Sequence, residues 1–311
     1  MILTVTANPA FDVTYRVTEL TPGSSHRTAA PLARAGGKGV NVARVAQSQG
    51  FESLALFTSG GDTGARFVED LRGGQLAFRA VPVAAETRRS IAIVSDSGEA
   101  TLLNETGTAL TGEETERVLT AVRDAAATAR VIAISGSMPP GEAVLERLIE
   151  AARSSTDPAH SPAIIVDTSG PALLAAAAAG AHVLKPNHIE LAEATGITDP
   201  IAGARHLIDL GASLIVVSRG EDGMVAVSGS GPTVSARLPR VLSGNPTGAG
   251  DAAVAAIAAT LTTQSLAEVS AAPEPMLRQA VAWSAAAVLM PLAGSISDEH
   301  AALAAEVAIT H

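Results

Sequence analysis

The chain has 311 residues, of which 47% are hydrophobic and 17% are charged, and its formal net charge is -10. This composition supports a large buried core and excludes an intrinsically disordered chain. The acidic balance disfavours nucleic acid and anionic membranes as partners, and the absence of cysteine excludes disulfides and thiolate metal sites.

The N-terminal stretch MILTVTANPAFD has neither a basic segment nor a long apolar segment, so we expect no signal peptide. The longest run of low polarity, at 173–184, is too short and too rich in alanine to span a bilayer. We therefore expect a cytoplasmic protein.

Short β-rich runs alternate along the chain with helical patterns, which predicts a parallel sheet with helices on both faces. Several of these runs are continuously apolar, as is typical of strands buried on both sides. The expected strands cover 2–6, 54–58, 91–95, 131–135, 163–167, 182–185, 214–218 and 224–228, and the clearest helical patterns cover 112–129, 142–153 and 202–211.

Two segments break this alternation. Residues 9–33 contain the short alternating runs FDVTYRV and HRTAAPL around TPGS, with no helical pattern. Residues 86–104 predict a hairpin that turns at residues 96–98. Both segments are candidates for a small sheet outside the main one.

Ligands of open α/β sheets bind beyond the carboxyl ends of the strands, so the residues that follow each strand carry the functional argument. Asp12, after the first strand, is a candidate to hydrogen-bond a polyol, although Asp is also a common turn residue. Next comes AGGKGVNVARVA (35–46), a glycine-rich loop that feeds a helix and suits an anionic or hydroxyl-rich ligand. Its spacing matches neither the P-loop nor the dinucleotide-binding pattern.

Two later stretches offer charged and hydroxyl groups. Arg88 and Arg89 precede the strand at 91–95 and are either an anion clamp or solvated surface groups. SGSMPPG (135–141) follows an apolar strand and places the Ser137 hydroxyl beside a ligand, or is an ordinary connection between strand and helix.

KPNHIELAEATG (185–196) places Lys185 at a strand end and Asn187 and Glu190 on one face of the helix that follows. These two side chains are suited to hold the waters of a hydrated Mg²⁺, or to form a capping box, or both. SRGEDG (218–223) is either a close backbone approach to a ligand or a plain hairpin turn.

NPTGAGDA (245–252) combines three small residues with an acid at the expected start of a helix at 251–261. Backbone N–H groups of 248–250 that point into one concavity would stabilise negative charge. Asp251 beside such a pocket is suited to accept a proton from a hydroxyl that attacks a phosphorus, and the alternative is a helix cap.

Together these stretches resemble the PfkB carbohydrate kinase family. AGGKGVNVAR is similar to the first family signature and NPTGAGDAAVAA to the second, and the resemblance covers nearly the whole chain. The chain looks most like the phosphosugar branch, which contains tagatose-6-phosphate kinase and 1-phosphofructokinase. The pointers to this branch are T-x-N-P-A-x-D, E-T-R before IAI, SGSMPPG and L-K-P-N-x-x-E-L.

The resemblance implies a role for each matched position. Asp251 would be the base for the accepting hydroxyl, and Gly248, Ala249 and Gly250 the anion hole. The sugar hydroxyls would be held by Asp12, Gly37 and Asn41, and the phosphate already on the sugar by Lys38, Arg88 and Arg27. Ser137 would also bind the substrate. The nucleotide would be held by Lys185, Asn187, Ser218, Gly220, Gly223 and Thr247, with Mg²⁺ near Asn187 and Glu190 through water.

The resemblance also implies a ribokinase-like, three-layer α/β/α fold with a mainly parallel sheet and a small β-sheet lid. The core would comprise 1–8, 34–85 and 105–311, and the lid over the sugar site 9–33 and 86–104, where two copies would pair as a homodimer. The expected activity is ATP-dependent phosphorylation of a ketohexose monophosphate to a bisphosphate, with tagatose 6-phosphate or fructose 1-phosphate as acceptor. The alternatives are fructose 6-phosphate, an unphosphorylated sugar or nucleoside, or a non-catalytic sugar-phosphate sensor.

Overall fold

The computed structural model describes residues 1–141, 143–153, 161–229 and 231–311. Its strands are β1 (Ile2–Thr6), β2 (Ala10–Val17), β3 (Leu32–Ala35), β4 (Ser53–Ser59), β5 (Phe78–Pro82), β6 (Arg88–Ser95), β7 (Ala100–Asn104), β8 (Val131–Ser135), β9 (Ala163–Asp167), β10 (Val183–Leu184), β11 (Leu214–Ser218), β12 (Met224–Ser228), β13 (Val234–Arg237) and β14 (Ala308–Thr310). The helices are α1 (Lys38–Ser48), α2 (Gly61–Gly73), α3 (Gly112–Ala126), α4 (Val144–Arg153), α5 (Pro171–Ala178), α6 (His188–Thr195), α7 (Pro200–Leu210), α8 (Ala249–Leu261), α9 (Leu266–Ala271), α10 (Glu274–Val288) and α11 (His300–Glu306), with a 3₁₀ turn η1 (Gly220–Asp222).

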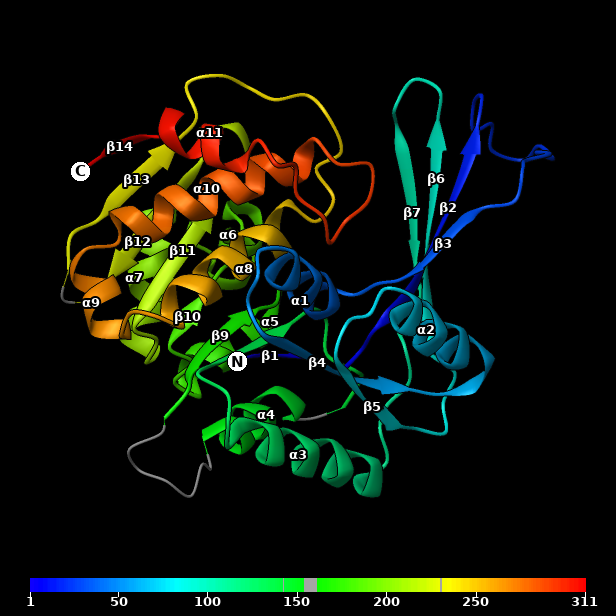
Figure 1. The fold of residues 1–311 in the computed structure, drawn as a ribbon, viewed down its shortest axis with the longest axis horizontal. Helices are drawn as coiled ribbons and strands as arrows, with labels where there is room; N and C mark the ends of the chain where they lie inside the picture. Colours follow the sequence, from blue (N-terminus) through cyan, green and yellow to red (C-terminus); the bar gives the residue numbers. More distant parts are fainter. Residues whose placement is uncertain (142, 154–160, 230) are drawn as a thin grey trace.

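Ten strands form the main sheet, in the order β14-β13-β12-β11-β10-β9-β8-β1-β4-β5. The strands from β11 to β5 run parallel, whereas β12, β13 and β14 add an antiparallel edge. Helices cover both faces of this sheet (Figure 1). The predicted α/β fold with a mainly parallel sheet is confirmed.

The continuously apolar strands are buried on both faces, as their sequences predict. Along β1, Ile2 packs with α8 and α10 on one side of the sheet, and the next residue, Leu3, packs with α3 and α4 on the other. Helix α8 is buried along its length from Asp251 to Leu261. Its many alanines let it lie close to both the sheet and α10, so this helix is held firmly where it begins, at Gly248.

A second, four-stranded sheet, the small sheet, has the order β3-β2-β6-β7 and projects from the body beside α1 and α2 (Figure 1). Strands β6 and β7 form the hairpin predicted around residues 96–98, and β2 pairs with β6 in parallel. Of the alternating run HRTAAPL, residues 26–31 form no strand, and β3 begins only at Leu32. Pro31 lacks an N–H group to pair, and residues 26–30 are exposed. Strand β3 runs to Ala35 and so spans the predicted boundary between residues 33 and 34.

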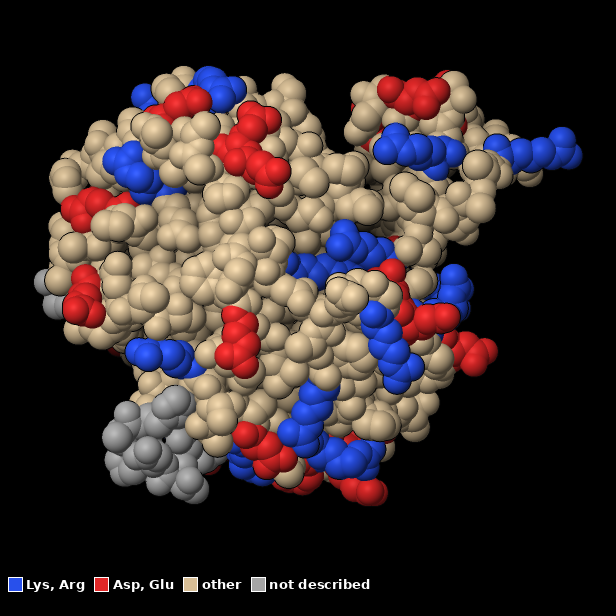
Figure 2. Space-filling model, in the orientation of Figure 1, with Lys and Arg blue, Asp and Glu red and all other residues tan. Residues whose placement is uncertain are grey.

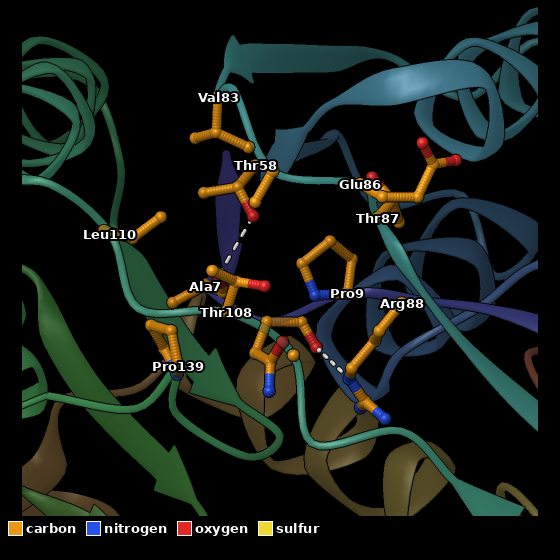
Figure 3. Close-up of a pocket in the computed structure, with 13 residues that line it drawn as sticks. Ala7, Pro9, Thr58, Val83, Glu86, Thr87, Arg88, Thr108, Leu110 and Pro139 are labelled. Atoms are coloured by element: carbon orange, nitrogen blue, oxygen red, sulfur yellow. Dashed lines mark hydrogen bonds between the residues drawn. The ribbon is translucent and has the colours of Figure 1, made fainter.

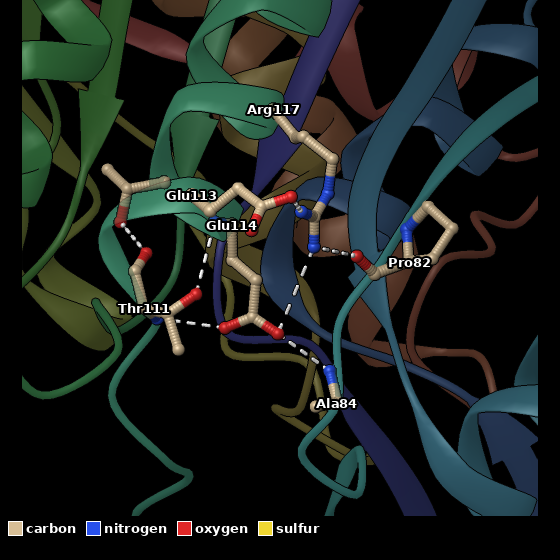
Figure 4. A network of polar contacts seen from close by, with 7 residues as sticks. Pro82, Ala84, Thr111, Glu113, Glu114 and Arg117 are labelled. Atoms are coloured by element: carbon tan, nitrogen blue, oxygen red, sulfur yellow. Dashed lines mark hydrogen bonds and ion pairs between the residues drawn. The ribbon is translucent and has the colours of Figure 1, made fainter.

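The start of α3 is tied to the segment that leads into β6. Thr111 and Glu114 form a capping box, with distances of 2.8 Å from Thr111 N to Glu114 Oε2 and 3.2 Å from Glu114 N to Thr111 Oγ1. The other Glu114 oxygen accepts from Ala84 N at 2.7 Å, and Arg117 donates to the carbonyl of Pro82 (Figure 4). This network fixes the chain a few residues before Arg88.

On the face shown in Figure 2, acidic and basic side chains are interspersed, and a notch separates the small sheet from the body. Within the described residues no helix is long and apolar enough to cross a membrane.

Candidate active site

Asp251 lies in the first turn of α8, where its side chain is 6% exposed. The helix begins at Ala249 with Gly248 as its N-cap, so the alternative of Asp251 as the helix cap is wrong. Asn41 Nδ2, from α1, donates a hydrogen bond of 2.9 Å to Asp251 Oδ2. Burial raises the pKa of Asp251 to about 6, with a contribution from Asp167, while Lys38, Asn41 and Lys185 lower it. The carboxylate is therefore ionised near neutral pH yet is a better proton acceptor than a solvated Asp.

The loop before Asp251 requires small residues. Gly248 has a positive φ of 89°, and a Cβ there would lie 2.8 Å from Ala293 Cβ. A Cβ at Gly250 would point toward Lys185 Nζ at 3.4 Å. The Ala249 N–H is already bound to the Pro246 carbonyl at 3.2 Å, so the expected three donors reduce to the amides of Gly248 and Gly250.

Asp167, which the sequence argument did not single out, lies at the centre of the charged groups. Its Oδ1 is 3.3 Å from Lys38 Nζ and 3.5 Å from Lys185 Nζ. Burial acts to raise the pKa of Asp167, but Lys185 and Lys38 outweigh it and hold that pKa below its usual value. The sequence did contain a signal for this residue, because AIIVD is an apolar strand that ends in an acid. Asp12 and Lys185 were singled out on the same ground, since each follows a predicted strand.

Asn187 and Glu190 form the predicted capping box at the start of α6. Glu190 N donates to Asn187 Oδ1 at 2.8 Å, and Asn187 N donates to Glu190 Oε2 at 2.9 Å. Glu190 Oε1 is 3.9 Å from Lys38 Nζ. Nowhere in the described ranges do three or more acidic or histidine side chains gather as metal ligands.

Asp12 and Arg88 lie on neighbouring strands of the small sheet. Burial raises the pKa of Asp12 to about 6, while Arg88 lowers it and Asp251 raises it. Arg88 donates to the carbonyls of Asn8 and Glu105 at 3.2 and 3.1 Å, and its Nη2 lies 3.5 Å from Ser137 Oγ. The structure thus brings two of the predicted substrate residues, Arg88 and Ser137, together.

Asn8 is a second residue that the sequence argument missed. Its Nδ2 donates to the Thr106 carbonyl at 3.0 Å and to Ser137 Oγ at 3.1 Å, so it joins the chain leaving β7 to the loop after β8. A cavity of about 20 Å³ lies beside Asn8 and Arg88 (Figure 3), with room for one water and not for a sugar.

Arg44 and Asp70 hold the backbone at the start of the glycine-rich loop that begins at Ala35. Arg44 donates to the Ala35 carbonyl at 2.5 Å, and Asp70 Oδ2 accepts from both Ala35 N at 3.1 Å and Arg44 Nη2 at 2.7 Å. Gly37 is the N-cap of α1 with a φ of 96°. A Cβ at the neighbouring Gly36 would overlap Asp12 Oδ2, so this glycine lets Asp12 lie against the loop.

Other predicted residues lie apart from these contacts. Arg27 is exposed in the connection between β2 and β3. Among the described residues, its side chain forms no hydrogen bond or ion pair. Residues 218–223 form the predicted hairpin turn between β11 and β12, and a Cβ at Gly223 would lie 2.0 Å from the Ala236 carbonyl. That glycine is required by packing against β13. Ser218 bridges to Asn187, and Thr247 N donates to Asn245 Oδ1 at 3.0 Å.

The chain is similar to known proteins in sequence and in structure. The family described as pfkB family carbohydrate kinase matches residues 5–300. The chain is 38% identical to "ATP-dependent 6-phosphofructokinase isozyme 2" of Mycobacterium tuberculosis, over 82% of this chain and 76% of the relative. It is 33% identical to "1-phosphofructokinase" of Xanthomonas campestris, over 83% of each. The structure of phosphofructokinase-2 from Escherichia coli in complex with fructose-6-phosphate superposes with a TM-score of 0.83 at 30% identity, over 98% of both chains.

Proposed function

Because this chain belongs to the pfkB family of carbohydrate kinases, we propose that it transfers the γ-phosphoryl group of ATP to a free hydroxyl of a ketohexose monophosphate, giving a bisphosphate and ADP. The observation that carries this proposal is the setting of Asp251. It is a buried carboxylate at the start of α8, held by Asn41 and with a pKa raised to about 6.

In the proposed reaction, the sugar hydroxyl oxygen attacks the γ-phosphorus while Asp251 accepts the hydroxyl proton. The bond from the γ-phosphorus to the oxygen that bridges it to the β-phosphate breaks, and ADP leaves with that electron pair. The amides of Gly248 and Gly250, at the N-terminus of α8, face the developing charge. Positioning and charge stabilisation supply most of the rate in such a transfer.

For the acceptor, we propose that Asp12, Gly37 and Asn41 hold sugar hydroxyls. Arg88 with Ser137 would hold the phosphate already on the sugar, since their side chains are 3.5 Å apart and Arg88 faces Asp12. Fructose 1-phosphate and tagatose 6-phosphate remain our first candidates. Fructose 6-phosphate is the second, supported by the relatives named for that substrate.

For the nucleotide, we propose contacts from Lys185, Asn187 and the loops containing Ser218, Gly220, Gly223 and Thr247. Glu190 Oε1 and the second lone pair of Asn187 Oδ1 would hold Mg²⁺ through its waters, because the capping box already uses Glu190 Oε2 and one lone pair of Asn187 Oδ1. When bound, Mg²⁺ would neutralise part of the phosphate charge.

We further propose that the small sheet is a lid over the sugar site and a surface on which two copies pair. Leu32, Leu102 and Leu103 on this sheet are 57%, 60% and 54% exposed. Such apolar exposure on a sheet favours association. Sedimentation velocity tests this: the wild type should be a dimer or larger and Leu102→Asp should dissociate, whereas a monomeric wild type would exclude the pairing.

A screen of ADP release tests the activity. Purified protein is supplied with ATP, Mg²⁺ and, in turn, tagatose 6-phosphate, fructose 1-phosphate and fructose 6-phosphate, with free ketohexoses as controls. We expect turnover with at least one phosphosugar, and loss of most turnover in Asp251→Asn with nucleotide binding retained. A protein that binds a phosphosugar but turns over none of them would instead be a sensor.

A further inference from the structure

Asp167 holds two lysines that come from distant parts of the chain. Lys38 is the first residue of α1, and Lys185 follows β10. Their Nζ atoms lie 3.3 and 3.5 Å from the same oxygen, Asp167 Oδ1. Since one oxygen contacts both ammonium groups, the two charges are held side by side against their mutual repulsion.

This pair of lysines faces the start of α8. Lys185 Nζ would lie 3.4 Å from a Cβ on Gly250, and both lysines lower the pKa of Asp251. The Lys38 side chain is 38% exposed, whereas Lys185 is 4% exposed and Asp167 fully buried. Of the two lysines, Lys38 therefore has the more exposed side chain, beside the place where a γ-phosphoryl group would meet Asp251.

Lys38 and Arg88 have different polar partners. The charged partners of Arg88 are Asp12 and Glu105, and those of Lys38 are Asp167, Glu190 and Asp251. Through the described part of the chain, these two cations share no hydrogen bond or ion-pair partner. The ammonium group of Lys38 is thus held by a different set of groups from the one that holds the guanidinium of Arg88.

We propose that Lys38 contacts the phosphoryl group in transfer and not the phosphate already on the sugar, and that Asp167 is a positioning residue for Lys38 and Lys185. This inference rests on the proposed function and replaces the expected role of Lys38 as a sugar-phosphate ligand. Asp167 neutralises one of the two lysine charges and leaves the other for the phosphoryl group. A cation fixed at that place stabilises charge that grows in the transition state.

Lys38→Met tests the first part. Turnover at saturating substrates is measured, and the dissociation constant of the accepted phosphosugar is measured by calorimetry without ATP. We expect kcat to fall about 100-fold, the scale of losing one group that stabilises the transition state. The dissociation constant should stay within a factor of about two, well below the tenfold change that 1.4 kcal/mol would give.

Arg88→Ala is the matched control, with weaker binding of the phosphosugar. A Lys38→Met protein that loses phosphosugar binding and keeps kcat would overturn the assignment.

A double-mutant cycle tests the second part. Asp167→Asn keeps the shape of the side chain and removes its charge. If Asp167 acts through the lysines, Asp167→Asn combined with Lys38→Met should lose little more kcat than the worse single variant. Losses that multiply would refute the positioning role. Lys38→Arg, which keeps the charge, should recover part of kcat, and no recovery would count against a contact with the phosphoryl group.

The outcomes separate the two proposals. If the wild type turns over none of the phosphosugars, the proposed function fails. If the wild type is active and Lys38→Met behaves like Arg88→Ala, only the present inference fails. Thermal melts check folding, and Lys38→Met should remain folded because Asp167 keeps Lys185 as a partner.

Discussion

Removing the hydrogen bond from Asn41 to Asp251 should shift the pH dependence of the reaction. Asn41 is 6% exposed and its Nδ2 donates to Asp251 Oδ2 at 2.9 Å, so Asn41→Leu removes a donor that water cannot easily replace. A hydrogen bond to a charged group contributes about 1.5–3 kcal/mol. At about 1.4 kcal/mol per pKa unit, its loss should raise the pKa of Asp251 by about 1–2 units.

The direction in which the pH profile of activity shifts follows from the role of Asp251 as the base. Asp251 must be ionised to accept the hydroxyl proton, so activity is lost as pH falls through its pKa, which is about 6 in the wild type. Without the donor the ionised form is less stable, and activity should be lost at a higher pH, about 7–8. The measurement is kcat/KM from pH 5 to 9, because this ratio reports the free enzyme.

Asp12 provides an internal reference in the same experiment. Its pKa is also raised to about 6, so the acid side of the wild-type profile should be steep and contain two ionisations. In Asn41→Leu one ionisation should stay near pH 6 while the other moves upward. A uniform loss of kcat/KM at every pH, with the acid side unmoved, would refute the assignment of Asp251 as the base that Asn41 stabilises.

Three further predictions concern stability. Between pH of about 4 and 6 the folded protein binds a proton at Asp251 that the unfolded chain releases, so the stability of the wild type falls as pH rises through this window. Asp251→Asn removes this ionisation, so at pH 8 its free energy of unfolding in denaturant should exceed that of the wild type by up to about 3 kcal/mol. Near pH 4 the variant should show no gain. Gly248→Ala should lose roughly 1–2 kcal/mol from its φ of 89° alone, and most activity, because its Cβ would press on Ala293; normal kinetics would contradict this. Thr111→Ala should cost about 1 kcal/mol by loss of the cap on α3, with kcat unchanged, and a large fall in kcat would show that the network in Figure 4 reaches the site.

The sequence by itself predicted most of the buried strands of the main sheet and their alternation with helices. Apolar runs such as VIAIS and LIVVS predicted buried strands because a strand covered on both faces has no polar side to show. Asn187 and Glu190 predicted their capping box because its donors and acceptors lie within four residues. The loop before Asp251 was found for the same local reason, since small residues before a helix mark a close backbone approach.

Only the tertiary structure decided which side chains meet. Asn41 is 210 residues from Asp251, and Lys38 is 129 residues from Asp167, so no local pattern links either pair. The sequence alone does not say whether the ammonium group of Lys38 pairs more closely with Asp167 or with Glu190. The buried charge of Asp167 decides between them, since an unpaired carboxylate in the core is costly and two ammonium groups lie within reach.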